Sequence, residues 1–236
     1  MKIKTVVLTL LYTLTAANLH AQQDGFLSFT APAYLPETFY KTFGKDLPIY
    51  NGRLYQGYLP TITGTPFLDE DQWTGGIVFF DSTWYKDVQL KYDVVAGELM
   101  VDNPGRMPVI LPNNRLYGFT LGQRKFVKLG PGNSSLLSSG FYEMLSEGTL
   151  TALALRKKTI KETTGQSVIE REFIWNTRFF IYKDGTFYPV NSKRNLYAII
   201  KEKKAAIHKV LKKNDIRFRK NPEAAIRTAT QLYNQD

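Results

Sequence analysis

The chain has 236 residues, no cysteine, two histidines and a formal net charge of +10. The absence of cysteine excludes disulfides, a thiolate nucleophile and a cysteine-based zinc site, so a folded domain must depend on burial of an apolar core. The charge is concentrated at one end, because residues 191–236 contain 12 Lys and Arg against 4 Asp and Glu, whereas residues 22–190 are neutral overall. A neutral body with a basic terminal module gives no support for nucleic-acid binding.

Residues 1–21 are typical of a secretory signal peptide. Two lysines precede an uncharged, largely apolar stretch from Thr5 to Ala17, and small and polar residues follow as far as Ala21. The apolar stretch is shorter than the about 20 residues that cross a bilayer as a helix. We therefore expect cleavage near Ala21 and a mature chain without a transmembrane segment, located in the periplasm or secreted.

Residues 22–190 have the pattern of a β-rich body. Val88, Leu90 and Tyr92 alternate with polar residues, which predicts a strand with one buried face. The same alternation places Asp93 on the polar face, as an ordinary surface carboxylate. Frequent turn residues predict short antiparallel strands arranged as a meander, a sandwich or an open half-barrel.

Several segments of the body predict particular connections. Asp184-Gly185 is typical of a tight hairpin turn, and Asp81-Ser82-Thr83 predicts another turn between two apolar runs. Residues 130–140 are rich in Gly and Ser and are the expected junction if the body has two lobes. The polar stretch Thr159–Gln166 is expected to be a loop or a strand overhang. The cations near it are expected on a solvated edge: Arg156, Lys157, Lys158 and Lys161.

Residues 191–236 are predicted to be a helical module of the same fold. Ser192 is a favourable N-cap, and apolar residues then recur at helical spacing as far as Leu211. Asn221-Pro222 predicts the start of a second helix, because proline is favoured at the first helical position. We expect this pair of amphipathic helices to pack on the sheet, which makes the fold α+β and mainly antiparallel β.

A set of aromatic and turn residues is distributed over most of the chain after residue 50. Its members are Asn51-Gly52, Tyr55, Tyr58, Gly64, Pro66-Phe67, Trp73, Tyr85-Lys86-Asp87-Val88, Leu90, Tyr92-Asp93, Glu98-Leu99, Gly140-Phe141-Tyr142, Tyr182-Lys183-Asp184-Gly185 and Arg217-Phe218-Arg219-Lys220. Together they resemble a family of uncharacterised secreted or periplasmic proteins of Bacteroidota-type bacteria. The resemblance implies a shared fold and carries no activity, because aromatic and turn residues specify structure rather than a reaction.

Residues suited to catalysis are scarce. Once the signal peptide is removed, His208 is the one remaining histidine, and it falls on a basic helix face, so neither a Ser-His-Asp triad nor a His-rich metal site is expected. The densest acidic cluster is Asp69-Glu70-Asp71. It is a weak candidate for binding a hard cation such as Ca²⁺, and the alternative is a solvated acidic loop. We predict no catalytic residue and no cofactor.

The candidate binding surface is the basic face of the first predicted helix. It would approach anionic lipid headgroups or acidic polysaccharide, or an envelope protein partner, and the alternative is an ordinary solvated helix face. The residues on this face are Lys201, His208, Lys209 and Lys212.

These patterns favour a non-catalytic cell-envelope protein that binds or scaffolds a partner. Two alternatives stay open. A carboxylate-based glycan hydrolase would need two acids facing each other across a cleft. A carrier of a lipophilic ligand, built as an open half-barrel, predicts an apolar cavity lined by residues such as Phe79, Leu90 and Tyr92.

Overall fold

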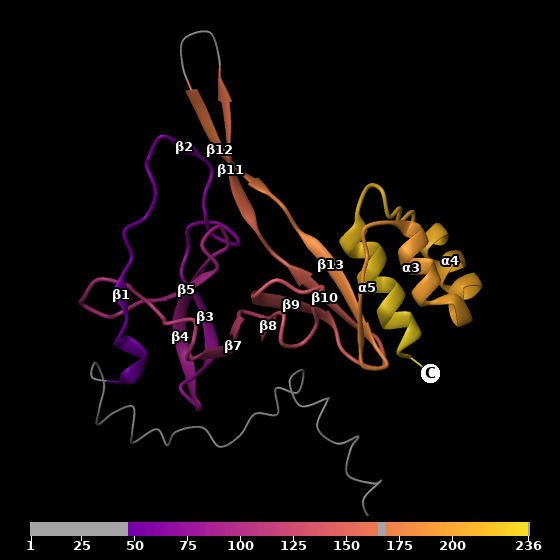
Figure 1. Ribbon diagram of the computed structural model, residues 1–236, viewed down its shortest axis with the longest axis horizontal. Helices are drawn as coiled ribbons and strands as arrows, with labels where there is room; N and C mark the ends of the chain where they lie inside the picture. Colours follow the sequence, from indigo (N-terminus) through magenta and orange to yellow (C-terminus); the bar gives the residue numbers. More distant parts are fainter. Residues whose placement is uncertain (1–46, 165–168, 236) are drawn as a thin grey trace, which may run out of the picture. The chain divides into compact units, whose positions relative to one another are not determined.

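The computed structural model describes residues 47–164 and 169–235, so the predicted signal peptide at residues 1–21 lies outside the described part of the chain. Within the described residues, eleven strands form one open antiparallel sheet, and helices follow it at the C-terminal end (Figure 1). The fold is α+β and mainly antiparallel β, as predicted. In spatial order the strands are β1 (Arg53–Leu54), β6 (Val109–Ile110), β5 (Glu98–Val101), β4 (Thr83–Asp93), β3 (Thr74–Phe80), β7 (Leu116–Leu121), β8 (Arg124–Leu129), β9 (Gly140–Ser146), β10 (Thr151–Leu155), β13 (Arg178–Lys183) and β14 (Thr186–Pro189).

Tight turns connect two pairs of neighbouring strands where the sequence predicts them. Asp81 and Ser82 have φ angles of 51° and 60° and join β3 to β4. Asp184 and Gly185 have φ angles of 48° and 77° and join β13 to β14. Positive φ at both central residues matches the right-handed twist of the paired strands, so these turns set the register of each hairpin.

Strand β4 shows both the success and the limit of the alternation pattern. Its three predicted core residues are at most 6% exposed, whereas Gln89 between them is exposed. The prediction for Asp93 is wrong, because this carboxylate is fully buried. The strand ends there, and the Asp93 Oδ1 atom accepts hydrogen bonds of 2.9 Å from the backbone N–H groups of Val95 and Ala96. The chain turns immediately after Asp93, so the alternation of buried and exposed residues along β4 does not extend to this side chain.

The first core is rich in aromatic side chains and lies along strands β3 to β9. Phe119 and Phe126 are stacked with ring centroids 4.7 Å apart, and Tyr92 and Phe141 pack edge-on against Phe119. All four side chains are at most 2% exposed. Each such ring buries a large apolar area, so this cluster is a major source of stability for the first part of the sheet. A short 3-10 helix, η2 (Pro48–Tyr50), adds Ile49 to the same core.

The second core joins the other end of the sheet to the helices. Strand β9 contributes to both cores, with Phe141 in the first and Leu145 in the second. From the sheet, the second core also takes the small side chains of Ala152 and Ala154 on β10, which let helices approach the backbone closely. The other buried residues of this core are Leu150, Ile181, Val190, Leu196, Ile199, Ile200, Ile207, Leu211, Ile226 and Ala229.

The helical module packs on the sheet as predicted, but among the described residues it has three α-helices instead of two. These are α3 (Lys193–Ile199), α4 (Lys204–Lys213) and α5 (Pro222–Tyr233), with a 3-10 turn, η3 (Lys201–Lys203), between α3 and α4. The predicted N-cap at Ser192 and the predicted helix start at Asn221-Pro222 are confirmed, and Ser192 and Asn221 each accept a hydrogen bond from a backbone N–H of the first turn.

The first predicted helix breaks after Ile199. Ile199 and Ile200 are both buried in the second core, and Lys203 would follow on the same face of a continuous helix. The 3-10 turn instead lets the Lys203 Nζ atom donate a 2.9 Å hydrogen bond to the carbonyl oxygen of Tyr233, at the end of α5. A cation there is favoured by the partial negative charge of the helix C-terminus.

A smaller sheet of three strands projects from the large one. Strands β11 (Lys158–Thr164) and β12 (Ile169–Trp175) form a long antiparallel hairpin, and β2 (Ile62–Thr63) pairs in parallel with β12 (Figure 1). Most residues of the hairpin are exposed. The strand overhang expected around residues 159–166 is therefore confirmed for its described part.

The solvated edge predicted at the base of this hairpin is wrong for Lys158. Its side chain is buried, and its Nζ atom donates hydrogen bonds to the carbonyl oxygens of Thr65 and Phe67, at 2.8 and 2.5 Å. The same nitrogen lies 4.5 Å from the ring centroid of Trp175. Burial lowers the pKa of Lys158. Lys157 and Lys161 are exposed, as predicted.

Candidate functional site

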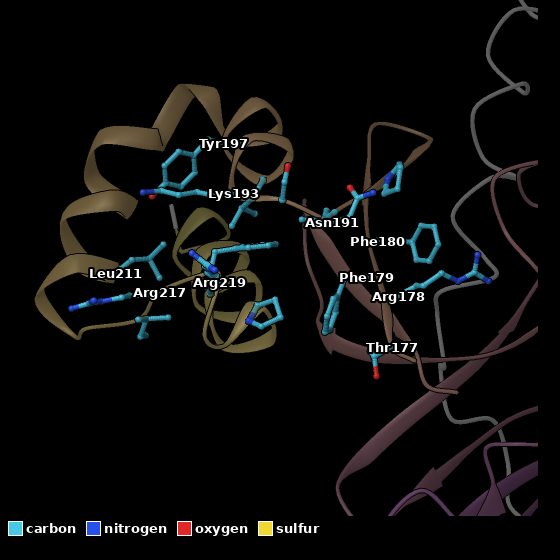
Figure 2. A pocket seen from close by; sticks show the side chains of 18 of the residues that line it. Thr177, Arg178, Phe179, Phe180, Asn191, Lys193, Tyr197, Leu211, Arg217 and Arg219 are labelled. Carbon is cyan, nitrogen blue, oxygen red and sulfur yellow. The ribbon is translucent and has the colours of Figure 1, made fainter. Parts of the chain in front are cut away.

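A pocket of about 1170 Å³ lies between strands β13 and β14 and the helical module (Figure 2). We call it the helix–sheet pocket. One wall comes from residues 177–180, at the start of β13, and from residues 189–192, where the chain leaves β14 for α3. The opposite wall comes from α3, α4 and the loop between α4 and α5.

The floor of the helix–sheet pocket is apolar. Leu196 and Leu211 are buried members of the second core, and Phe179, Ile216 and Phe218 pack against that core while staying partly exposed. These half-exposed apolar side chains give the pocket a surface that water solvates poorly. The floor residues are Phe179, Leu196, Leu211, Ile216, Phe218 and Ala225.

The end of α4 directs the loop that forms this floor. Asp215 has a φ angle of 49°, which is the left-handed conformation common just after a helix. The backbone N–H of Ile216 then donates to the carbonyl of Leu211 at 2.9 Å, and that of Asp215 donates to the carbonyl of Lys212 at 3.2 Å. These two bonds are the Schellman arrangement, which brings the Ile216 side chain back toward Leu211.

The rim of the pocket is cationic. The lining residues include five Lys and Arg and one carboxylate, that of Asp215. The Arg217 Nε atom donates to Asp215 at 2.8 Å, and the Arg178 Nη2 atom donates to the Ser138 hydroxyl at 2.8 Å. Within residues 47–164 and 169–235, Lys212 and Arg219 have no ion pair with a carboxylate. The cationic side chains are Arg178, Lys193, Lys212, Arg217 and Arg219.

The basic face predicted from the sequence divides between the pocket and open solvent. All four of its residues are exposed, but His208 and Lys212 line the pocket while Lys201 and Lys209 do not. His208 shares a hydrogen bond of 2.8 Å, through its Nδ1 atom, with the hydroxyl of Tyr197. Burial raises the pKa of Tyr197. Two of the four predicted residues, His208 and Lys212, therefore lie in one pocket with residues of other strands and helices.

Several pocket residues were not predicted as a site. The segment Arg217-Phe218-Arg219 belongs to the set of aromatic and turn residues described above, and its alternation of cationic and apolar side chains is the local signal of a mixed surface. Arg178 and Phe179 lie about 40 residues earlier in the chain and have no comparable local signal. They reach the pocket only because β13 pairs with β10, on which the helices pack.

The three residues of the acidic cluster each have a different partner. Asp69 accepts a hydrogen bond of 2.8 Å from the Arg124 Nη1 atom, and Asp71 pairs with Lys91. Glu70 is exposed and accepts a hydrogen bond from Gln72. Across the described ranges, no group of three or more Asp, Glu, His or Cys side chains is arranged to hold a metal ion.

Asp93 forms a second polar centre, away from the pocket. The hydroxyls of Tyr55 and Tyr58 donate to its two carboxylate oxygens at 3.2 and 3.3 Å. Burial raises the pKa of both tyrosines, and the charge of Asp93 and its hydrogen bonds raise it further. With its two backbone donors, Asp93 thus has four partners within the protein. This centre clamps the segment of Tyr55 and Tyr58 to the end of β4.

A chain of buried and half-buried ion pairs links the sheet to α5. Glu143 is 2% exposed and binds Arg124 through two hydrogen bonds of 2.9 and 2.8 Å. Its Oε2 atom also accepts a 2.6 Å bond from Arg156, whose Nη1 atom donates to Glu223 at 2.7 Å. Glu223 in turn pairs with Arg227. The solvated position predicted for Arg156 is therefore wrong, because its side chain is only 11% exposed and pairs with both Glu143 and Glu223.

The cavity predicted for a half-barrel carrier does not coincide with the helix–sheet pocket. Leu90 and Tyr92 are packed within the first core, and neither they nor Phe79 line the pocket. Phe79 stacks on Trp84, with ring centroids 4.7 Å apart. The side chains that form the apolar floor of the helix–sheet pocket come from β13, the helices and the loop between α4 and α5.

Comparisons with known proteins identify no relative of this chain, so its function has to be argued from the fold and the pocket. No family model matches the chain, and no curated protein and no solved structure shows significant similarity to it. The resemblance to secreted Bacteroidota-type proteins stays a prediction. In the parts of the chain that the structure describes, no helix has the length and apolar character needed to cross a membrane.

Proposed function

We propose that the protein is a non-catalytic binding module of the cell envelope, and that it binds an anionic partner in the helix–sheet pocket. The envelope location rests on the signal peptide predicted at residues 1–21. The binding role rests on one observation, which is the set of five cationic side chains around an apolar floor with Asp215 as the single carboxylate.

Electrostatics supports an anionic partner. Like charges gathered around a concave surface raise the local concentration of counter-ions, because the low-dielectric walls focus their field. Lys212 and Arg219 lack a carboxylate partner in the described part of the chain, so a ligand anion would not first have to displace an existing ion pair. Arg217 can offer a planar pair of donors to phosphate or carboxylate from the face that Asp215 leaves free.

The side chains of the pocket also favour binding over hydrolysis. A glycan hydrolase of the carboxylate type needs two acids across the scissile bond. The lining residues supply one, and it is paired with Arg217. Tyr197 on α3 and His208 on α4 both line the pocket, where this hydrogen-bonded pair adds polar groups for a ligand.

A charge-matched comparison tests this function. The full chain would be mixed with vesicles containing phosphatidylglycerol, and separately with polygalacturonate, and the bound fraction measured by co-sedimentation or anisotropy. Lys212→Ala/Arg219→Ala removes two charges from the pocket. Lys201→Ala/Lys209→Ala removes two charges from exposed positions outside it. We expect the pocket variant to bind at least one probe about tenfold more weakly than the control variant.

Two results would contradict the proposal. The first is that neither probe binds the full chain. The second is that the two double variants lose affinity equally, because that result would mean that overall charge, and not the pocket, attracts the anion.

A further inference from the structure

We infer that the ligand of the helix–sheet pocket is an amphiphile with an acyl chain and a phosphate or carboxylate head. The chain would lie on the apolar floor and the head at the cationic rim. This inference rests on the proposed function and makes its ligand class specific.

The size and chemistry of the floor favour an acyl chain. The pocket volume of about 1170 Å³ exceeds the about 300–1,000 Å³ typical of small-molecule sites. Phe179, Ile216 and Phe218 line it while remaining partly exposed. An acidic polysaccharide would satisfy the cations but leave these side chains against a hydrated sugar chain. An acyl chain removes them from water and gains affinity with every methylene buried.

The cationic rim of the pocket offers hydrogen-bond donors to the anionic head of the amphiphile. Lys212 lies at the end of α4, and Arg217 and Arg219 follow in the loop that also supplies Ile216 and Phe218. Cationic and apolar side chains thus alternate along residues 216–219, and in Figure 2 Arg217 and Arg219 lie on the helix side of the pocket, whereas Phe179 lies on the strand side. Arginine donates paired hydrogen bonds to phosphate and carboxylate oxygens, so an anionic head would be held next to the place where its chain enters the floor.

Removal of the Asp215 carboxylate tests whether the positive charge of the rim attracts the ligand. Its carboxylate neutralises part of the rim through Arg217, and its backbone has the left-handed conformation that glycine adopts without strain. Asp215→Gly would therefore remove the one acid of the pocket and preserve the Schellman turn. We expect this variant to bind the anionic amphiphile severalfold more tightly than the unchanged chain does.

The deciding experiment is a chain-length series. Lysophosphatidylglycerols with 8, 10 and 12 carbons in the acyl chain would be titrated below their critical micelle concentrations into the full chain, with calorimetric detection. We expect saturable binding whose affinity rises up to about fourfold for each added methylene, as burial of a methylene in an apolar site predicts. A monoacylglycerol of the same chain length lacks the charge and should bind about tenfold more weakly.

Variants assign the binding to this pocket. Lys212→Ala/Arg219→Ala should reduce the affinity for lysophosphatidylglycerol about tenfold, and Lys201→Ala/Lys209→Ala should leave it within about twofold. Residues 1–46 are common to all variants, so any association that they cause cancels in this comparison.

The outcomes separate the ligand class from the proposed function. If polygalacturonate binds in a pocket-dependent way and no lysophosphatidylglycerol does, the ligand is a hydrophilic polyanion and the inference is wrong, although the proposed function holds. Affinity independent of chain length would also overturn the inference, because the floor would then play no part. If neither kind of anion binds, both proposals fail.

Discussion

The surroundings of the first core and the lining of the helix–sheet pocket use their charged residues differently. Around the first core, cations face carboxylates, as in the pairs of Arg53 with Glu98 and of Arg115 with Asp81. The helix–sheet pocket is lined by five cations and one carboxylate, which pairs with Arg217. Apolar packing differs in the same way, since the first core encloses its aromatic rings and the pocket leaves Phe179 and Phe218 half-exposed. The first region is built to be stable, and the second keeps surface that is available to a ligand.

The largest difference between the regions should appear on truncation of an aromatic ring. Phe119 is fully buried and touches the rings of Tyr92, Phe126 and Phe141. Phe119→Ala should lower the free energy of unfolding by about 3–5 kcal/mol. Phe218→Ala should cost less than about 2 kcal/mol, because its ring is already partly solvated. Urea denaturation measures both values, and equal losses would contradict the division into a packed core and an open floor.

A comparison of two carboxylates tests the ion pairs next. Glu143→Gln leaves Arg124 and Arg156 without their shared charge in a buried setting, so we expect a loss of about 3 kcal/mol in unfolding free energy. Glu162→Gln removes a pair with Arg171 at the exposed hairpin and should cost less than about 1 kcal/mol. A loss of similar size at both positions would show that Glu143 does not hold the sheet to α5.

The pH dependence of stability should report the outer part of the same network. Burial raises the pKa of Glu223, but the hydrogen bonds and charges of Arg156 and Arg227 outweigh burial and hold it below its ordinary value. The stabilisation is therefore complete above the ordinary value of about 4.3 and is lost as the pH falls through the lower folded-state pKa. Glu223→Gln should be less stable than the unchanged chain at pH 7, and the two should converge in acid.

Urea midpoints at pH 7, 5, 4 and 3 would follow this convergence. A difference between the two proteins that stays constant down to pH 3 would contradict the assignment of the acid-labile contribution to Glu223.

The smallest expected effect lies at the start of α5. The Asn221 side chain accepts a 2.9 Å hydrogen bond from the backbone N–H of Ala224. Asn221→Ala should cost about 1 kcal/mol in unfolding free energy. The exposed Gln231→Ala on the same helix is the control and should change stability by less than about 0.5 kcal/mol. Equal effects would mean that the cap contributes nothing measurable.

Local patterns were sufficient for most of the secondary structure. The period of two in β4 as far as Tyr92, the turn dipeptides, the cap at Ser192 and the helix start at Asn221-Pro222 depend on residues within a few positions of each other, and the structure confirms them. The break between α3 and α4 was missed because the contact of Lys203 with Tyr233 spans 30 residues.

The burial of charged residues and the pocket could not be predicted for the same reason. Arg156 meets Glu223 across 67 residues, and Lys158 meets Thr65 across 93. The pocket combines a strand residue such as Phe179 with a loop residue such as Arg219. Two of the four residues of the predicted basic face line the pocket. Helical spacing places side chains on one face of a helix, but it does not tell which part of that face meets another element.

The central claim is that acyl chains bind on the floor of the helix–sheet pocket, and photo-crosslinking tests it most directly. The full chain would be irradiated with a fatty acid that carries a diazirine in its tail, and the adducts would be located by mass spectrometry. Our account predicts adducts within residues 178–180 and 211–219, and fewer of them in Lys212→Ala/Arg219→Ala. Adducts concentrated instead at the exposed Ile160 and Trp175 of the projecting hairpin would contradict it.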